Sequence, residues 1–215
     1  KLIALATLAS VLAFVQGDDD SWLRWDAARA QAIGKAAHVQ GRVGGFLDTR
    51  ILQTDRSYNY KLAATWMTSD VIRATARTQQ LSQRLDDAAA RALVAEAAAA
   101  GDTVVMVEID PREGSGVIPE DWSAFLQPAS PKGVEGGAAV RGEPRPQLRE
   151  VKALAGVLRR NYDYDRFWVV FPLQHADGKP VFGAADVEAE LVVRIADREG
   201  RVTWPIPLSV RREQK

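Results

Sequence analysis

Apolar positions in the first half of the chain recur at helical spacing. Over residues 22–40 they repeat every three or four residues, and the segment ends at Gly41. A second segment of this kind follows the N-capping residues at 68–70 and runs to residue 85. A third, over 86–100, is rich in alanine and stops at Gly101. We expect a first helix, and then a helical hairpin that packs on a sheet.

The period changes to two in other parts of the chain. Residues 58–66 alternate between large and small or polar side chains and pair with 42–54 in a predicted β-hairpin. The mostly apolar residues 103–110 predict a strand that is buried on both faces. Further strands are expected at 166–173, 179–182, 187–195 and 202–210. Because proline has no N–H to donate, Pro205 and Pro207 predict that the last one is an edge strand or leaves the sheet at these residues.

A proline- and glycine-rich segment divides the chain. Residues 127–147 contain few large apolar side chains and predict a long exposed loop. Residues 146–160 then have the spacing of another amphipathic helix. The fold class expected is α+β, with mainly antiparallel β-sheet or a β-sandwich, a helical hairpin and two additional helices. Residues 18–126 and 148–215 form one folded domain in this interpretation.

The N-terminal residues have the order of a secretory signal peptide. Lys1 precedes an apolar run over residues 2–15, which is followed by Gly17 and three aspartates. A membrane span needs about 20 residues, so the run is short for one. We expect residues 1–17 to direct export of a bacterial protein to the periplasm or the medium. The alternatives are an uncleaved membrane anchor, which is the only membrane contact expected, and a buried N-terminal helix.

The composition of the chain excludes several kinds of functional site. Of 215 residues none is cysteine, and His38 and His175 are the two histidines. Disulfides, thiolate nucleophiles, cysteine-ligated zinc and three-histidine zinc sites are therefore excluded. The 28 basic and 28 acidic residues give no net charge, and we expect no nucleic-acid partner. His38 falls in the last turn of the first helix, where a cation suits the helix dipole.

Acidic residues gather around residues 108–122. Two carboxylates beside an aromatic side chain are the minimum for glycoside hydrolysis, one protonated and one ionised. Alternatively the acids pair with Arg112 or begin a helical turn. The low-ranked catalytic candidates are Asp110, Glu113 and Asp121, together with Glu120, and Trp122 is the adjacent aromatic residue.

Two other segments suggest chemistry only weakly. Ser115 stands in Gly-Ser-Gly, but a nucleophile elbow has glycine two residues to each side, so a triad of Ser115, His175 and an aspartate has little support. Asn161, Asp163 and Asp165 place oxygen donors at alternate positions, as a calcium site can. The alternative is a strand entrance whose acids face water. Calcium is the one cofactor considered, and none is expected.

A non-catalytic binding module is the leading functional hypothesis. Loops on a rigid scaffold usually carry binding residues, and we expect the contacts at Glu113, Ser115 and Trp122 and in the proline-rich segment. The partner would be an unknown protein or glycan of the cell envelope. A glycan hydrolase that uses carboxylates and a calcium-stabilised adhesive domain are the alternatives. Trp22 and Trp25 are candidates for an exposed binding surface, although they can equally close the core.

Overall fold

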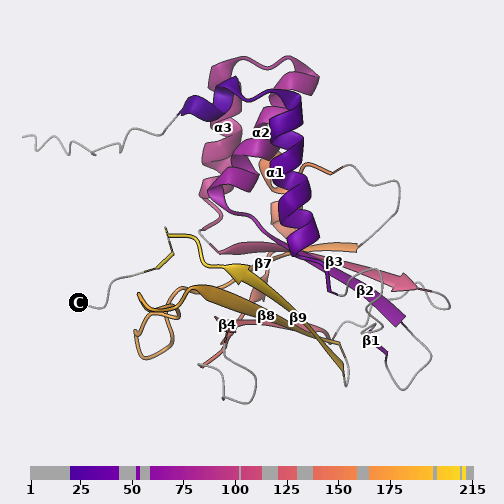
Figure 1. Cartoon of the computed structure of the whole chain (residues 1–215), viewed down its shortest axis with the longest axis vertical. Helices are drawn as coiled ribbons and strands as arrows, with labels where there is room; N and C mark the ends of the chain where they lie inside the picture. Colours follow the sequence, from indigo (N-terminus) through magenta and orange to yellow (C-terminus); the bar gives the residue numbers. More distant parts are fainter. Residues whose placement is uncertain are drawn as a thin grey trace, which may run out of the picture.

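Two antiparallel sheets and a layer of helices make up the structure (Figure 1). The computed structural model describes residues 20–43, 52–53, 59–101, 103–112, 121–129, 138–158, 165–195, 198–208 and 210–211. The fold class is α+β, as expected. The first sheet has the order β1-β2-β3-β7-β6 and the second the order β5-β4-β8-β9. The strands are β1 (Leu52–Gln53), β2 (Asn59–Trp66), β3 (Val104–Arg112), β4 (Ser123–Pro128), β5 (Val140–Arg141), β6 (Glu143–Pro144), β7 (Asp165–Val170), β8 (Glu188–Ile195) and β9 (Arg198–Pro205).

The first sheet is the middle layer of the molecule. Its central strand, β3, is buried on both faces, which confirms the expectation from its apolar sequence. Val105, Val107 and Ile109 pack between the two sheets, whereas Val104 and Met106 pack beneath the helices. This alternation follows from the period of two along a strand. The strand therefore contributes to two separate apolar cores.

Three α-helices cover the outer face of the first sheet, as Figure 1 shows. They are α1 (Ala27–Gln40), α2 (Ser69–Gln83) and α3 (Asp87–Ala98), with a 3₁₀ helix, η1 (Asp20–Arg24), before α1. Asp26, Thr68 and Asp86 cap the three α-helices by accepting a backbone N–H three residues ahead. Helices α2 and α3 form the expected hairpin. Their buried alanines allow the helices to pack closely on one another and on the segment after β6.

The structure corrects the expected helix over 146–160. The chain instead forms two short 3₁₀ helices, η2 (Pro146–Glu150) and η3 (Lys152–Leu154). Val151 between them is extended, with φ −77° and ψ 104°. The apolar spacing has another explanation, because Leu148 and Leu154 are buried from these two turns rather than from one helix. The indole N–H of Trp168 also donates to the carbonyl of Leu154 at 2.9 Å.

Other differences concern exposure and the proline-rich segment. Trp22 and Trp25 are buried in the core that the helices form, so the candidate exposed surface at these residues is wrong. The expected loop at 127–147 contains the short strands β5 and β6. The last strand, β9, does lie at an edge of its sheet and ends at Pro205.

None of the helices in the described part of the chain has both the length and the apolar character to cross a membrane. The predicted leader, residues 1–17, lies outside the described residues.

Candidate ligand-binding site

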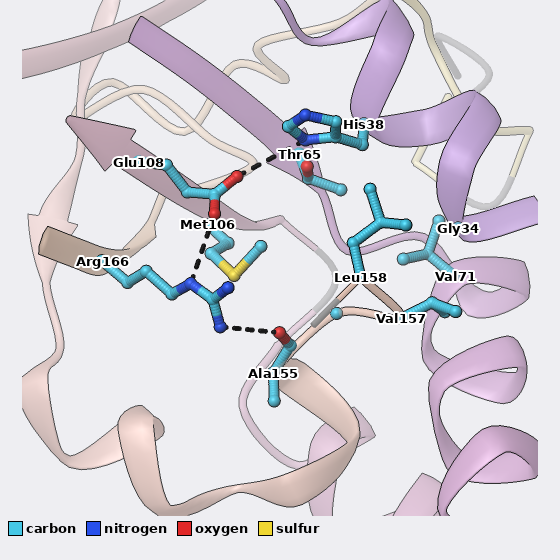
Figure 2. A pocket seen from close by; sticks show the side chains of 11 residues that line it. Gly34, His38, Thr65, Val71, Met106, Glu108, Ala155, Val157, Leu158 and Arg166 are labelled. Atoms are coloured by element: carbon cyan, nitrogen blue, oxygen red, sulfur yellow. Dashed lines mark hydrogen bonds and ion pairs between the residues drawn. The ribbon is translucent and has the colours of Figure 1, made fainter. Parts of the chain in front are cut away.

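A buried carboxylate lies between the first sheet and the helices. Glu108 of β3 is directly opposite Arg166 of β7 in the register of the sheet. Arg166 Nε donates to Glu108 Oε1 at 3.2 Å, and Arg166 Nη1 donates to the carbonyl of Ala155 at 3.3 Å. His38 Nδ1 lies 3.4 Å from the other carboxylate oxygen, Glu108 Oε2. Figure 2 shows the three side chains converging from α1, β3 and β7.

The end of α1 holds His38 in this position. Gly41, which ends the helix, lies so close to β2 that an added Cβ would be 1.6 Å from the carbonyl oxygen of Ala64. The N–H of Ala64 donates to the carbonyl of Gly41 at 2.8 Å. A larger residue at position 41 would push the last turn of the helix away from the sheet. Glycine there lets the helix deliver a histidine to the centre of the sheet's outer face.

Burial makes this arrangement costly unless every charge has a partner. Glu108 is 2% exposed and His38 is 6% exposed. An isolated charge in such surroundings would cost several kcal/mol, so a buried carboxylate needs a cation and hydrogen bonds. Arg166 supplies the cation from the neighbouring strand, and His38 approaches the second oxygen. The three residues therefore act as one electrostatic unit.

A small cavity adjoins the three residues. It is lined by Thr65, Met106 and Val157, among others, and gives the centre of a water molecule about 20 Å³. The hydroxyl of Thr65 is buried and has no hydrogen-bond partner in the described part of the chain. A histidine next to a carboxylate resembles the base and orienting acid of a catalytic triad. A cavity of this size admits one water molecule but no substrate, so the described walls do not form an active site.

A second, larger pocket lies at the edge of the first sheet, where β6 and η2 meet β7. Its volume is about 210 Å³, and three arginines line it: Arg145, Arg149 and Arg166. Arg145 pairs with Glu143 at 2.8 Å, and Arg166 pairs with Glu108. Arg149 is exposed and forms no ion pair with any residue that the structure describes. Among the described residues, two of the three guanidinium groups thus pair with a carboxylate, and that of Arg149 pairs with none.

The rest of the pocket wall is apolar and rigid. Pro144 and Pro146 stand on either side of Arg145, and residues 167 and 168 of β7 complete the lining. The N–H of Arg145 donates to the carbonyl of Trp168 at 2.7 Å, which ties the proline-rich segment to β7. Arg166 lines both this pocket and the small cavity. It is the residue through which the buried carboxylate and the arginine pocket are connected.

Known proteins give no assignment for this site. No protein-family model, curated protein or solved structure matches the chain. The function is therefore argued from the residues of the site itself.

Few of the sequence-predicted site residues lie in this region. Asp121 is exposed, and Trp122 is half-buried with its ring 4.9 Å from that of Phe167, measured between centroids. Asp165 is exposed at the start of β7. Asp110 lies on β3, but its side chain is outside the description. Outside the described residues altogether are Glu113, Ser115, Glu120, Asn161 and Asp163.

The described residues provide no further support for the calcium site or for the serine triad. No group of three acidic or histidine side chains that could hold a metal ion occurs among them. His175 begins a turn that Gly178 closes by donating to its carbonyl at 2.9 Å. The hydrogen bond from Lys179 lowers the pKa of Asp177 in that same turn. The turn is therefore organised around an exposed Asp177–Lys179 pair.

The connection of His38, Glu108 and Arg166 was missed in the sequence. His38 was assigned to the helix end alone, and Glu108 to an acidic cluster. One signal was available, because Glu108 is a charged residue inside a strand otherwise predicted to be buried on both faces. A buried carboxylate requires a partner, but the identity of that partner depends on which strand lies beside β3.

Proposed function

We propose that the chain is a non-catalytic binding module that holds a carboxylate, sulfate or phosphate group of its partner in the arginine pocket. One observation carries this proposal: three arginines line a pocket to which the described residues contribute no acidic side chain. The predicted leader, residues 1–17, supports an exported location. The partner would then be an anionic group on a molecule of the cell envelope or of its surroundings.

The chemistry of arginine supports an anionic ligand. A guanidinium group presents several donors in a planar fork that matches carboxylate and phosphate oxygens. Arg149 has no competing ion pair among the described residues, so its donors are available without loss of an existing contact. Arg166 uses Nε and Nη1 for Glu108 and Ala155. Its Nη2 makes no hydrogen bond to the described residues.

The size and walls of the pocket limit what can enter. Pockets for drug-sized ligands have volumes of about 300–1,000 Å³. A volume of about 210 Å³ suits one anionic group with a short attached segment. Pro144 and Pro146 belong to the proline-rich segment that the sequence identified as a contact surface. Their rings keep the mouth of the pocket in one shape, since proline fixes φ.

Calorimetric titration with sodium sulfate, phosphate and acetate at low ionic strength tests the proposal. The unmodified chain should bind at least one of these anions, and Arg149→Gln should weaken that binding about 10-fold or more, because a hydrogen bond to a charged group contributes about 1.5–3 kcal/mol. Arg24→Gln is the matched control, because Arg24 is exposed at the end of η1 and does not line the pocket. Equal affinities of the unmodified chain and Arg149→Gln would contradict the proposal, as would the absence of binding for all three anions.

A further inference from the structure

Among the described residues, β7 has a neighbouring strand along only part of its outer edge. β7 has six residues, whereas β6, which lies beside it at the edge of the first sheet, has two. β6 pairs with Val169 and Val170, and the N–H of Arg145 then donates to the carbonyl of Trp168 at 2.7 Å. At Pro146 the chain turns into η2 and no longer follows β7. The first half of β7 is therefore left as an open sheet edge in the described part of the chain.

The register of β7 shows which backbone groups point to this open side. Along a strand in an antiparallel sheet, alternate residues direct their N–H and carbonyl groups to opposite neighbours. The N–H of Phe171 donates to the carbonyl of Thr103, which continues the pairing with β3. The odd-numbered residues of β7 therefore pair with β3. The even-numbered residues Arg166 and Trp168 direct their backbone groups to the side of β6.

These backbone groups lack partners in the described part of the chain. The carbonyl of Arg145 accepts from the N–H of Leu148 at 3.0 Å, and no hydrogen bond among the described residues joins it to the N–H of Trp168 opposite. Arg166 lies beyond the end of β6, where its N–H and carbonyl have no described strand to pair with. Trp168 is 4% exposed, and a buried N–H without an acceptor is rare in folded proteins. This edge therefore has the unused hydrogen-bonding groups that a ligand can satisfy.

The open edge and the arginine pocket are the same place. Residues 166–168 form one wall of the pocket, and Arg145 and Arg149 line it from the segment after β6. An extended peptide beside Arg166 meets the unpaired groups with its own backbone, as strands do when they add to an open sheet edge. Arg145 already occupies the position beside Trp168, so such a peptide has to end there. Arginines bind a C-terminal carboxylate at that end and repel an N-terminal ammonium group.

We infer that the arginine pocket binds the C-terminal end of an extended peptide. The backbone of the peptide exchanges hydrogen bonds with Arg166, and its terminal carboxylate is held by Arg149 and by the N–H of Trp168. This inference rests on the proposed function, because it concerns the same pocket. It goes further by naming the partner as a peptide with a free C-terminus, and by giving a role to backbone groups that binding of a simple anion does not need.

Calorimetric titration with related peptides tests the inference. The probe is acetyl-Thr-Val-Thr-Val with a free C-terminal carboxylate, because β-branched residues favour an extended backbone. The unmodified chain should bind it about fivefold or more tightly than acetate, because backbone hydrogen bonds add to the contact with the carboxylate. The same peptide with a C-terminal amide should bind about 10-fold more weakly, because it lacks the charge. Arg149→Gln should weaken binding of the free acid by a similar factor, and Arg24→Gln should leave it unchanged.

Two N-methylated peptides separate backbone pairing from recognition of the carboxylate. One is methylated at the last residue and the other at the residue before it, and both keep the free carboxylate. The two N–H groups of an extended peptide point to opposite sides, so only one of them can donate to the carbonyl of Arg166. One methylated peptide should therefore bind about fivefold more weakly than the probe, and the other should bind like it.

Amide hydrogen exchange locates the contact on the chain. The free-acid peptide should slow exchange at the N–H of Arg166, whereas acetate should not, because acetate has no backbone to pair with. The N–H of Arg201 in β9 is the matched control. It also points away from its sheet, because the even-numbered residues of β9 and Ile206 pair toward β8, and β9 is an edge strand. Its exchange should be the same with and without the peptide.

Three results would overturn the inference: a free-acid peptide that binds no more tightly than acetate or than its amide, equal affinities of the two methylated peptides, or unchanged exchange at Arg166. If sulfate, phosphate or acetate still bound in a way that depends on Arg149, the proposed function would stand without it. Failure of all Arg149-dependent binding would refute both.

Discussion

The two faces of the first sheet meet very different cores. The core between the two sheets contains large aromatic and aliphatic side chains, among them Trp66, Phe182 and Trp204, and the charged side chain that is buried in the described part of the chain, Glu108, lies outside it. The core beneath the helices contains more alanine together with three tryptophans, Trp22, Trp25 and Trp168, and Glu108 and His38 are buried beside it. The central strand β3 contributes to both cores by alternation. Among the described residues, the buried histidine and carboxylate therefore both lie on the side of the sheet that faces the helices.

This difference shows which side of the sheet can hold buried polar side chains without a large loss of stability. The aromatic rings between the sheets contact one another, with the centroids of Trp66 and Trp204 5.8 Å apart, and the buried indole N–H of Trp204 has no hydrogen-bond partner among the described residues. Helices can instead bring a donor to the sheet from a distance, as α1 does with His38. Buried polar groups need such partners, and the side of the sheet that is covered by helices can supply them.

The largest expected effect is that of removing the buried charge. Glu108→Ala should lower the free energy of unfolding by about 3–5 kcal/mol, because Arg166 and His38 are left without their carboxylate. Leu191→Ala, in the core between the sheets, should cost a similar 2–5 kcal/mol through the cavity it leaves. A second substitution, at Arg166, distinguishes the loss of a charge partner from the loss of packing. Arg166→Met should recover part of the loss in Glu108→Ala and none of the loss in Leu191→Ala.

Urea denaturation of the three single variants and the two double variants measures these free energies. Additive losses for Glu108→Ala and Arg166→Met would mean that the two residues do not interact, and that the two cores are stabilised in the same way.

The sequence was sufficient for the parts of the fold that depend on periodicity. The strands β2, β3 and β8 and the hairpin of α2 and α3 follow from spacing and caps over long segments. Residues 146–158 could not be predicted in this way. Pro146, Leu148 and Leu154 satisfy a helical pattern, yet the extended Val151 and the hydrogen bond from Trp168 divide the segment into two turns. Both features depend on β7 lying beside this segment, which local sequence does not reveal.

The site was predictable only in part, for a related reason. Contacts were expected in the proline-rich segment, which stays a prediction, and Arg145 of the arginine pocket lies in that segment. Arg149 and Arg166 belong to other segments and reach the pocket because β6 pairs with β7 at Val169 and Val170. The convergence of His38 and Arg166 on Glu108 likewise depends on strand order. Pairs between distant residues require the topology, which periodicity leaves open.

A smaller effect is expected from the hydroxyl of Thr65. This group is buried beside Glu108 without a partner among the described residues, so Thr65→Val should raise the free energy of unfolding by about 1 kcal/mol. Thr75→Val is the matched control, because the buried hydroxyl of Thr75 donates to the carbonyl of Val71 at 2.8 Å. Thr75→Val should lower the free energy of unfolding by about 1 kcal/mol. Thermal denaturation of both gives the signs, and a loss in Thr65→Val would show that its hydroxyl has a partner in solution.

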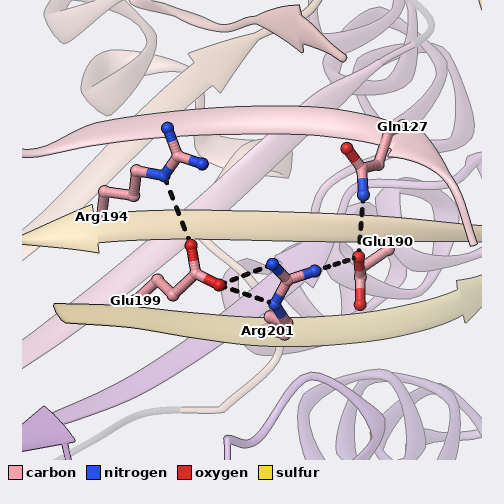
Figure 3. Close-up of polar contacts among 5 residues, drawn as sticks. All are labelled: Gln127, Glu190, Arg194, Glu199 and Arg201. Carbon is pink, nitrogen blue, oxygen red and sulfur yellow. Dashed lines mark hydrogen bonds and ion pairs between the residues drawn. The ribbon is translucent and has the colours of Figure 1, made fainter. Parts of the chain in front are cut away.

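The smallest effect is expected on the outer face of the second sheet. There Arg201 of β9 donates to Glu190 at 2.6 Å and to Glu199 at 2.9 Å, both at the surface (Figure 3). The hydrogen bond from Arg201 lowers the pKa of Glu199. The ionised carboxylate of Glu199 therefore stabilises the fold above the ordinary pKa of a glutamate, about 4.3. This contribution is lost as the pH falls through the lowered pKa of Glu199 in the folded chain.

Arg201→Ala tests how far exposure weakens the same kind of interaction that holds Glu108. At neutral pH the substitution should lower the free energy of unfolding by less than about 1 kcal/mol, because water and salt screen the pair. The loss should shrink at about pH 3 and in about 1 M salt, where the pairing is neutralised or screened. Arg194→Ala should lower the free energy of unfolding by less than Arg201→Ala, because the contact of Arg194 with Glu199 is longer, at 3.4 Å. A loss for Arg201→Ala as large as that of Glu108→Ala would mean that burial does not decide the strength of these pairs.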